Sequence, residues 1–158
     1  MQKTRFLAYT AMTAAVYVVL TLGVAPLSFG AVQIRFSEAL MLLAFLDKRY
    51  AAGLILGCFI ANCFSPLGIM DVAFGTTCTA AALYGMTHFS KTLFGSSLWP
   101  VFCNMFLAIE FYLLEGAPII FSAVTVALGE FLAVSCVGYV IFRQILKNKT
   151  LMAQLTIG

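Results

Sequence analysis

The sequence predicts an all-α integral membrane protein, a bundle of six transmembrane helices with both termini in the cytoplasm. Of the 158 residues, 63% are hydrophobic and 9% are charged, and the mean hydropathy is +1.04. Such a chain has too little polar surface to cover a water-soluble globule. Its apolar stretches are long and continuous, whereas barrel strands alternate over about ten residues. No linker or repeat divides residues 1–158, so we expect a single membrane domain.

Each expected helix is an apolar run that ends at a breaker or at charges. In chain order, the connections are "GVAPLSFGA", the charged "DKR", "SPLG", "HFSKTLFGSS" and "EGAP". The expected spans are residues 5–23, 33–47, 50–65, 70–88, 97–114 and 118–143. The uncharged run of the second span, Ala39 to Leu46, covers only part of the ~20 residues that a lone span needs. We therefore expect this helix to depend on its neighbours.

The basic residues indicate the orientation, because lysine and arginine are enriched in cytoplasmic loops. With six spans and both termini inside, the following basic residues lie on the inner side: Lys3, Arg5, Lys48, Arg49, Lys91, Arg143, Lys147 and Lys149. Only Arg35 lies near the outside. The formal net charge of +3 is therefore explained by orientation and gives no reason to expect nucleic acid as a partner.

The acidic residues predict a pocket that opens to the outside. In this orientation Glu38, Asp71 and Glu110 lie in the outer half of the membrane. Counting from Pro118, Glu130 lies roughly 18 Å along the sixth helix, near the middle of the bilayer. Ionisable groups at such depths usually face a cavity or a partner. Carboxylates from different helices, opposed by one arginine, suit a cation or a hydrogen-bond donor.

Several of these residues also have a structural interpretation. Arg35 and Glu38 could pair at i,i+3 on one helix face, or Arg35 could contact the ligand. Asp71 could be the N-cap of the fourth helix, which does not exclude binding. Asn62 could bond a neighbouring helix or serve the pocket. Glu115 fits a solvated loop charge.

Aromatic and small residues add two further candidates. Phe74 lies one turn beyond Asp71, and Tyr112 lies near Glu110, so either ring could stack on a flat ligand. In the first helix, Ala11 and Ala15 form a small-xxx-small pair that would let another helix approach closely. Ordinary bundle packing would explain the same spacing.

Missing motifs limit the chemistry. The chain has no G-x-x-x-x-G-K-[ST] loop, so it carries no ATPase motif of its own. Its single histidine, His88, excludes an H-E-x-x-H metal site. The dispersed cysteines, without C-x-x-C spacing, are interpreted as packing residues.

The stretches "GAVQIRFSEALMLLAFL" and "GLILGCFIANCFSPLGIMDVAFGT" resemble the QueT family, the substrate-binding S components of energy-coupling-factor (ECF) transporters assigned to queuosine precursors. The resemblance runs through nearly the whole chain and includes the R-x-S-E and N-x-x-S-P-L-G-x-x-D-x-x-F-G patterns. The short S-P-L-G connection and the basic pair Lys48-Arg49 are minor departures.

This resemblance implies a multi-pass protein of the bacterial cell membrane that is a transporter component and not an enzyme. It implies that the face with Ala11 and Ala15 docks on a transmembrane T subunit. Two cytoplasmic ATPase subunits would use ATP, and this chain would hold no cofactor and no metal. The loaded protein would tilt within the bilayer, and the loop "GVAPLSFGAVQ" would close over the site.

The implied ligand is a 7-deazaguanine such as preQ1, preQ0 or queuine. A carboxylate can accept hydrogen bonds from the ring N1–H and the exocyclic amine of such a base. A second carboxylate could pair with the aminomethyl cation of preQ1, while Asn62 or Arg35 donates to the ring carbonyl. The candidate carboxylates are Glu38, Asp71, Glu110 and Glu130, and the candidate stacking residues are Phe74 and Tyr112.

Two other functions remain open from the sequence. A self-sufficient, proton-coupled carrier of a small cationic solute would use Glu130 as its coupling carboxylate. An intramembrane enzyme would have to act through carboxylates alone, and Asp71 is the one aspartate in the membrane-facing part.

Overall fold

The computed structural model describes residues 2–30 and 33–156, and every regular element in these two ranges is helical. The 3-10 helix is η1 and the π-helix is η2. The elements are α1 (Gln2–Gly23), α2 (Ala25–Ser28), η1 (Phe36–Leu42), α3 (Leu43–Leu46), α4 (Tyr50–Asn62), α5 (Ile69–Phe89), α6 (Leu93–Asn104), α7 (Leu107–Glu115), α8 (Ile119–Glu130), η2 (Phe131–Gly138), α9 (Tyr139–Lys147) and α10 (Lys149–Leu155). The predicted all-α fold is confirmed for the described residues.

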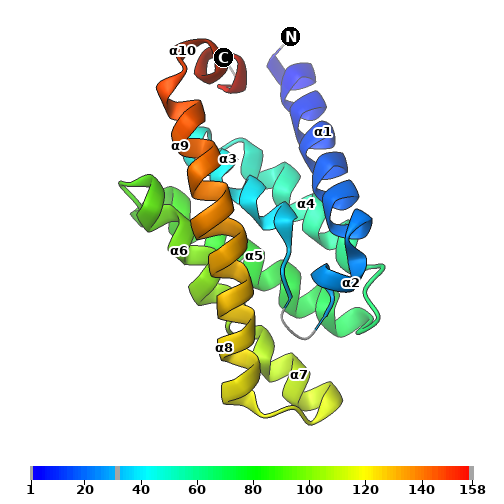
Figure 1. Ribbon diagram of the computed structural model, residues 1–158. Helices are drawn as coiled ribbons and strands as arrows, with labels where there is room; N and C mark the ends of the chain where they lie inside the picture. The colour runs from blue at the N-terminus through cyan, green and yellow to red at the C-terminus, as the bar shows by residue number, and fades with distance from the viewer. Residues whose placement is uncertain (1, 31–32, 157–158) are drawn as a thin grey trace.

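Three of the described helices are long and apolar enough to cross a membrane, Lys3–Gly23, Leu93–Glu115 and Ile119–Lys147. Phe36–Leu46 and Tyr50–Asn62 are shorter apolar helices. Figure 1 shows the start of α1 and α10 at one end of the bundle, with α7 and the first turn of α8 at the other. These features support a membrane protein, while the count of six spans and the cytoplasmic placement of the termini stay predictions.

Capping residues explain where the observed helices depart from the expected spans. The prediction that "HFSKTLFGSS" connects two helices is partly wrong, because α6 begins within this stretch, at Leu93. Thr92 precedes it, and its hydroxyl accepts a hydrogen bond from the Gly95 amide at 3.1 Å, as an N-cap does. The second expected helix begins late, at Phe36, because Arg35 is extended at φ −101° and ψ 97°.

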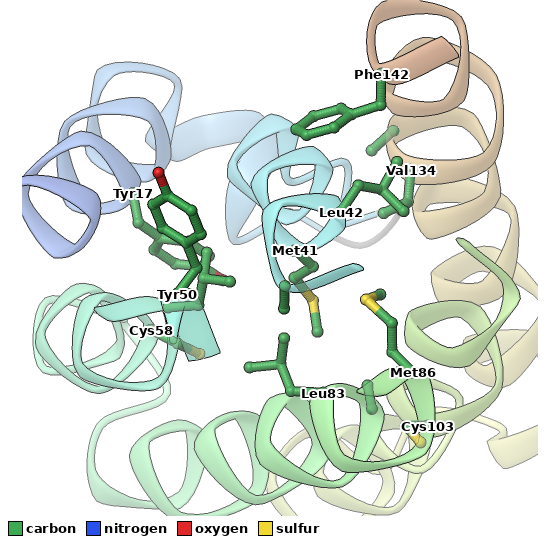
Figure 2. Close-up of a cluster of buried hydrophobic side chains, with 14 of the residues drawn as sticks. Tyr17, Met41, Leu42, Tyr50, Cys58, Leu83, Met86, Cys103, Val134 and Phe142 are labelled. Atoms are coloured by element: carbon green, nitrogen blue, oxygen red, sulfur yellow. The ribbon is translucent and has the colours of Figure 1, made fainter. Parts of the chain in front are cut away.

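The short helix η1 lies at the centre of the hydrophobic core. Met41 and Leu42 of η1 are fully buried, and they belong to one cluster with Tyr17 of α1, Leu83 of α5 and Val134 of η2. Figure 2 shows Met41 and Leu42 between Tyr17 on one side and Val134 on the other. Packing on several sides therefore supports a helix that is too short to be a span by itself.

The face of α1 that meets α4 is not the face with the predicted docking residues. A Cβ added at Gly57 of α4 would lie 2.8 Å from Tyr17 Cβ and 3.0 Å from the Ala14 carbonyl oxygen. Only glycine allows so close an approach of the two helices. Ala11 and Ala15 are exposed on the part of α1 that α4 does not cover.

Candidate functional site

Arg35 is the centre of a buried polar network that connects four segments of the chain. Its Nη2 lies 3.2 Å from Asp71 Oδ2, in an ion pair with α5. Its Nη1 donates to Asn62 Oδ1 of α4 at 3.2 Å, and its Nε donates to the Ser28 carbonyl of α2 at 3.0 Å. The Phe29 ring lies 5.3 Å from the guanidinium carbon. With Arg35 only 2% exposed, these contacts fix the start of η1 against α2, α4 and α5.

The pairing of Arg35 with Glu38 that the sequence suggested is wrong. An i,i+3 pair needs both residues on one helix, but Arg35 is extended and precedes η1. Its ion pair is with Asp71, while Glu38 accepts a hydrogen bond from the Tyr17 hydroxyl. Asp71 is also not an N-cap, because α5 already begins at Ile69.

Hydrogen bonds from α1 position Glu38. Tyr17 donates to its Oε1, and one turn further along α1 the Thr21 hydroxyl lies 2.7 Å from the Ser37 hydroxyl. The other oxygen of Glu38, Oε2, is buried and has no hydrogen-bond partner in the described structure. One carboxylate oxygen is therefore held by the protein, and the other is left to accept a further donor.

Glu130 is held in the same way from another helix. Asn104 of α6 donates through Nδ2 to Glu130 Oε1 at 2.8 Å. Glu130 Oε2 and Asn104 Oδ1 are buried without a described partner. Glu130 is the last residue of α8, where the chain passes into the π-helix η2. Such π-segments are frequent at functional sites.

Glu110 of α7 has no partner on either carboxylate oxygen in the described structure. It is fully buried, whereas Glu115, at the end of the same helix, is exposed. A buried carboxylate without partners is costly and calls for an explanation. Accepting donors from a bound molecule is one that fits the residue type.

Of the four candidate carboxylates, only Asp71 contacts the Arg35 guanidinium directly in the described residues. Asp71 is engaged in the ion pair, so the other three carboxylates keep unpaired oxygens. This arrangement can accept several hydrogen bonds and a positive charge from a ligand.

The predicted aromatic residues are not brought into this polar region by any described contact. Phe74 packs with Leu107 and Phe111 and lines an apolar groove of about 490 Å³ between α5, α6 and α7. Tyr112 is 51% exposed. The ring that lies on the polar network is Phe29, which the sequence analysis did not select.

Sequence reasoning also missed Tyr17, Gln33 and Asn104. Asn104 interrupts an apolar run just as Asn62 does, and the same argument would have selected it. The sequence has no comparable signal for Tyr17, because tyrosines are common in membrane helices. Gln33 was expected as the first residue of the second span, where one polar residue carries no signal; in the structure it lies in the non-helical segment before η1, and its side chain is buried.

Comparison with known proteins agrees with the resemblance. The model of the QueT transporter family matches residues 7–147. A curated relative from Lactococcus lactis subsp. cremoris (strain MG1363), the queuosine precursor transporter QueT, is 30% identical over 145 residues, covering 82% of this chain and 85% of the relative. No solved structure matches the chain. The apolar helices and this match make the protein a transporter rather than an enzyme. The chain belongs to the QueT transporter family.

Proposed function

We propose that this protein is the substrate-binding S component of an ECF importer in the bacterial cell membrane, and that it captures a queuosine precursor from outside. The family match supports transport, and the name of the Lactococcus lactis relative supports the substrate class. The proposed ligand is a 7-deazaguanine, namely preQ1, preQ0 or queuine.

One observation carries the ligand assignment. Glu38 of η1, Glu110 of α7 and Glu130 of α8 are fully buried, and each has at least one oxygen without a described partner. A 7-deazaguanine offers adjacent donors at N1–H and at the exocyclic amine, which one carboxylate can accept together. The aminomethyl cation of preQ1 would pair with a second carboxylate. Glu110 is suited to that role, because both of its oxygens are unpaired.

The network around Arg35 has a different part in this proposal. Most of its donors already serve Asp71, Asn62 and the Ser28 carbonyl. Asn62 Nδ2 in turn donates to the Asp71 carbonyl at 3.1 Å. We therefore assign Arg35, Asn62 and Asp71 mainly to fixing the wall of the site, with a remaining guanidinium N–H free to donate to the ring carbonyl.

The exposed face of α1 supports the proposed partner. Ala11 and Ala15 are exposed, while Ala14 and Tyr17 of the same helix pack against α4. Small residues on a free face let another membrane helix approach closely. We propose that a transmembrane T subunit docks there, and that two cytoplasmic ATPase subunits supply the energy.

The first test is ligand capture by the purified protein in detergent. Calorimetry and mass spectrometry would compare preQ1, preQ0, queuine, guanine and unrelated vitamins. Stoichiometric capture of a deazaguanine without turnover would support the proposal. Absence of binding to every purine-like compound would refute the substrate class. Uptake by the isolated protein in liposomes driven by a proton gradient alone would refute the S-component role and favour a proton-coupled carrier that uses Glu130.

A further inference from the structure

Gln33 carries a buried side-chain amide that has no hydrogen-bond partner among the described residues. The residue is 1% exposed, and neither its Nε2 nor its Oε1 has a partner within the part of the chain that the structure describes. An amide carries two N–H donors and a carbonyl acceptor. Leaving all of them unpaired in the interior costs free energy, so a group of this kind calls for a reason.

The backbone of Gln33 is strained as well. Its φ is 44°, and in residues 2–30 and 33–156 it is the one non-glycine residue with a positive φ. Its amide N–H donates to the Gly30 carbonyl at 2.9 Å. Residues other than glycine rarely adopt a positive φ, and the surrounding structure must impose this conformation. Such residues cluster at ligand sites.

The neighbouring residues place Gln33 beside the polar network. Gln33 comes two residues before Arg35 in a non-helical segment, and its N–H bonds Gly30, the residue after Phe29, whose ring lies 5.3 Å from the Arg35 guanidinium carbon. Ile34 packs against the hydrophobic cluster around η1. Arg35 turns to Asp71 and Asn62 instead. The backbone of Gln33 is therefore tied to the polar network on both sides, through Gly30 beside Phe29 and through Arg35.

We propose that Gln33 is a substrate-contacting, specificity-determining residue that reads a mixed donor–acceptor edge of the ligand ring; this assignment rests on the proposed function. Carboxylates contain only acceptors, so they match the two adjacent donors of a 7-deazaguanine, N1–H and the exocyclic amine. The opposite edge places the acceptor N3 beside the donor N9–H. A side-chain amide pairs with such an edge through two hydrogen bonds, as glutamine and asparagine do with bases elsewhere. Gln33 Nε2 donates to N3, and Gln33 Oε1 accepts from N9–H.

The test is a thermodynamic cycle in which the Gln33 side chain and ring position N3 of the ligand are changed separately and together. Calorimetry measures the affinity of each combination on the full chain in nanodiscs. The probes are preQ1 and its analogue in which ring nitrogen N3 is replaced by C–H. The native protein is expected to bind the analogue about tenfold more weakly than preQ1. Gln33→Met, of similar length but without an amide, is expected to bind preQ1 about tenfold to hundredfold more weakly. It should no longer distinguish the two compounds.

A second variant separates ligand contact from a structural role. Gln33→Gly removes the amide and accepts a positive φ without strain. It should lose preQ1 affinity to a similar extent, yet melt at the same or a higher temperature than the native protein without ligand. If Gln33 had only a structural role, Gln33→Gly would lower both the preQ1 affinity and the melting temperature.

Each remaining outcome is decisive. If the native protein binds preQ1 but Gln33→Met and Gln33→Gly bind it equally well, the assignment of Gln33 is overturned and the proposed function stands. The assignment is also overturned if replacing N3 of the ligand by C–H weakens binding to Gln33→Met as much as it weakens binding to the native protein. If the native protein binds neither compound, the proposed substrate fails and the assignment fails with it.

Discussion

Removing the carboxylate of Asp71 should strand a positive charge in the interior. Arg35 is 2% exposed and Asp71 is fully buried, and the ion-pair distance between them is 3.2 Å. In Asp71→Leu the guanidinium keeps the Ser28 carbonyl and Asn62 as partners but loses the only negative charge that it contacts directly in the described structure. Breaking a buried pair on one side typically costs about 3–5 kcal/mol, and we expect a loss of unfolding free energy in this range.

The double variant tests the cause of that loss. Arg35→Met alone leaves Asp71 as the stranded charge, so it should also cost about 3–5 kcal/mol. Arg35→Met combined with Asp71→Leu leaves no stranded charge from the pair. What remains is the unpaired Ser28 carbonyl and the unpaired Asn62 oxygen, at about 1–3 kcal/mol each. Arg35→Met leaves the same two groups unpaired and strands Asp71 in addition, so the double variant should be more stable than Arg35→Met and should lose far less than the sum of the two single losses.

The ion pair between Asp47 and Arg49, in the connection "DKR", provides a matched control. Arg49 Nη2 lies 2.7 Å from Asp47 Oδ2, which is closer than the pair of Arg35 and Asp71, but Arg49 is 44% exposed. The Asp47 side chain is 9% exposed, but water solvates the Arg49 guanidinium, so removing the Asp47 charge strands no buried cation. Pairs that reach the surface typically contribute about 0–1 kcal/mol. Asp47→Asn should thus have a small effect, although its ion pair is the shorter one.

The assay is equilibrium unfolding in mixed micelles, followed by far-ultraviolet circular dichroism. Burial, not distance, decides the predicted order of the variants. If Asp71→Leu costs no more than Asp47→Asn, or if the double variant loses nearly the sum of the two single losses, the reasoning is refuted.

Three further predictions concern the ligand, the partner and the packing of α1. Glu110→Gln should weaken preQ1 binding by about 1–3 kcal/mol in calorimetry, or by more if the aminomethyl cation is stranded, whereas the exposed Glu115→Gln on the same helix should leave the affinity unchanged. Ala11→Leu with Ala15→Leu should abolish co-purification of the T subunit and spare ligand binding; retained co-purification would contradict the docking face. Gly57→Ala should destabilise the fold by about 1–3 kcal/mol, since the added Cβ would lie 2.8 Å from a side-chain carbon of α1; an unchanged melting temperature would show that the two helices separate freely.

The sequence by itself determined the class of protein and most of the chemistry at the candidate site. In a bilayer, a long continuous apolar segment can pair its backbone N–H and C=O groups only as a helix. Composition and run length are therefore enough to predict an all-α membrane protein. Charged residues are scarce in such a chain, and each acidic residue within an apolar run is therefore a candidate by itself. For this reason Glu38, Glu110 and Glu130 were selected from the sequence, and the structure places all three in the interior.

Only the tertiary structure decided which groups are partners. Arg35 pairs with Asp71, 36 positions away, and not with Glu38, because Arg35 lies in an extended segment where helical spacing does not apply. Asn104 meets Glu130 across two helices, 26 positions apart. The strained backbone of Gln33 depends on how the connection to η1 packs. Local spacing describes contacts within one helix, whereas these contacts arise between helices whose relative rotation and depth are set by the packing of the whole bundle.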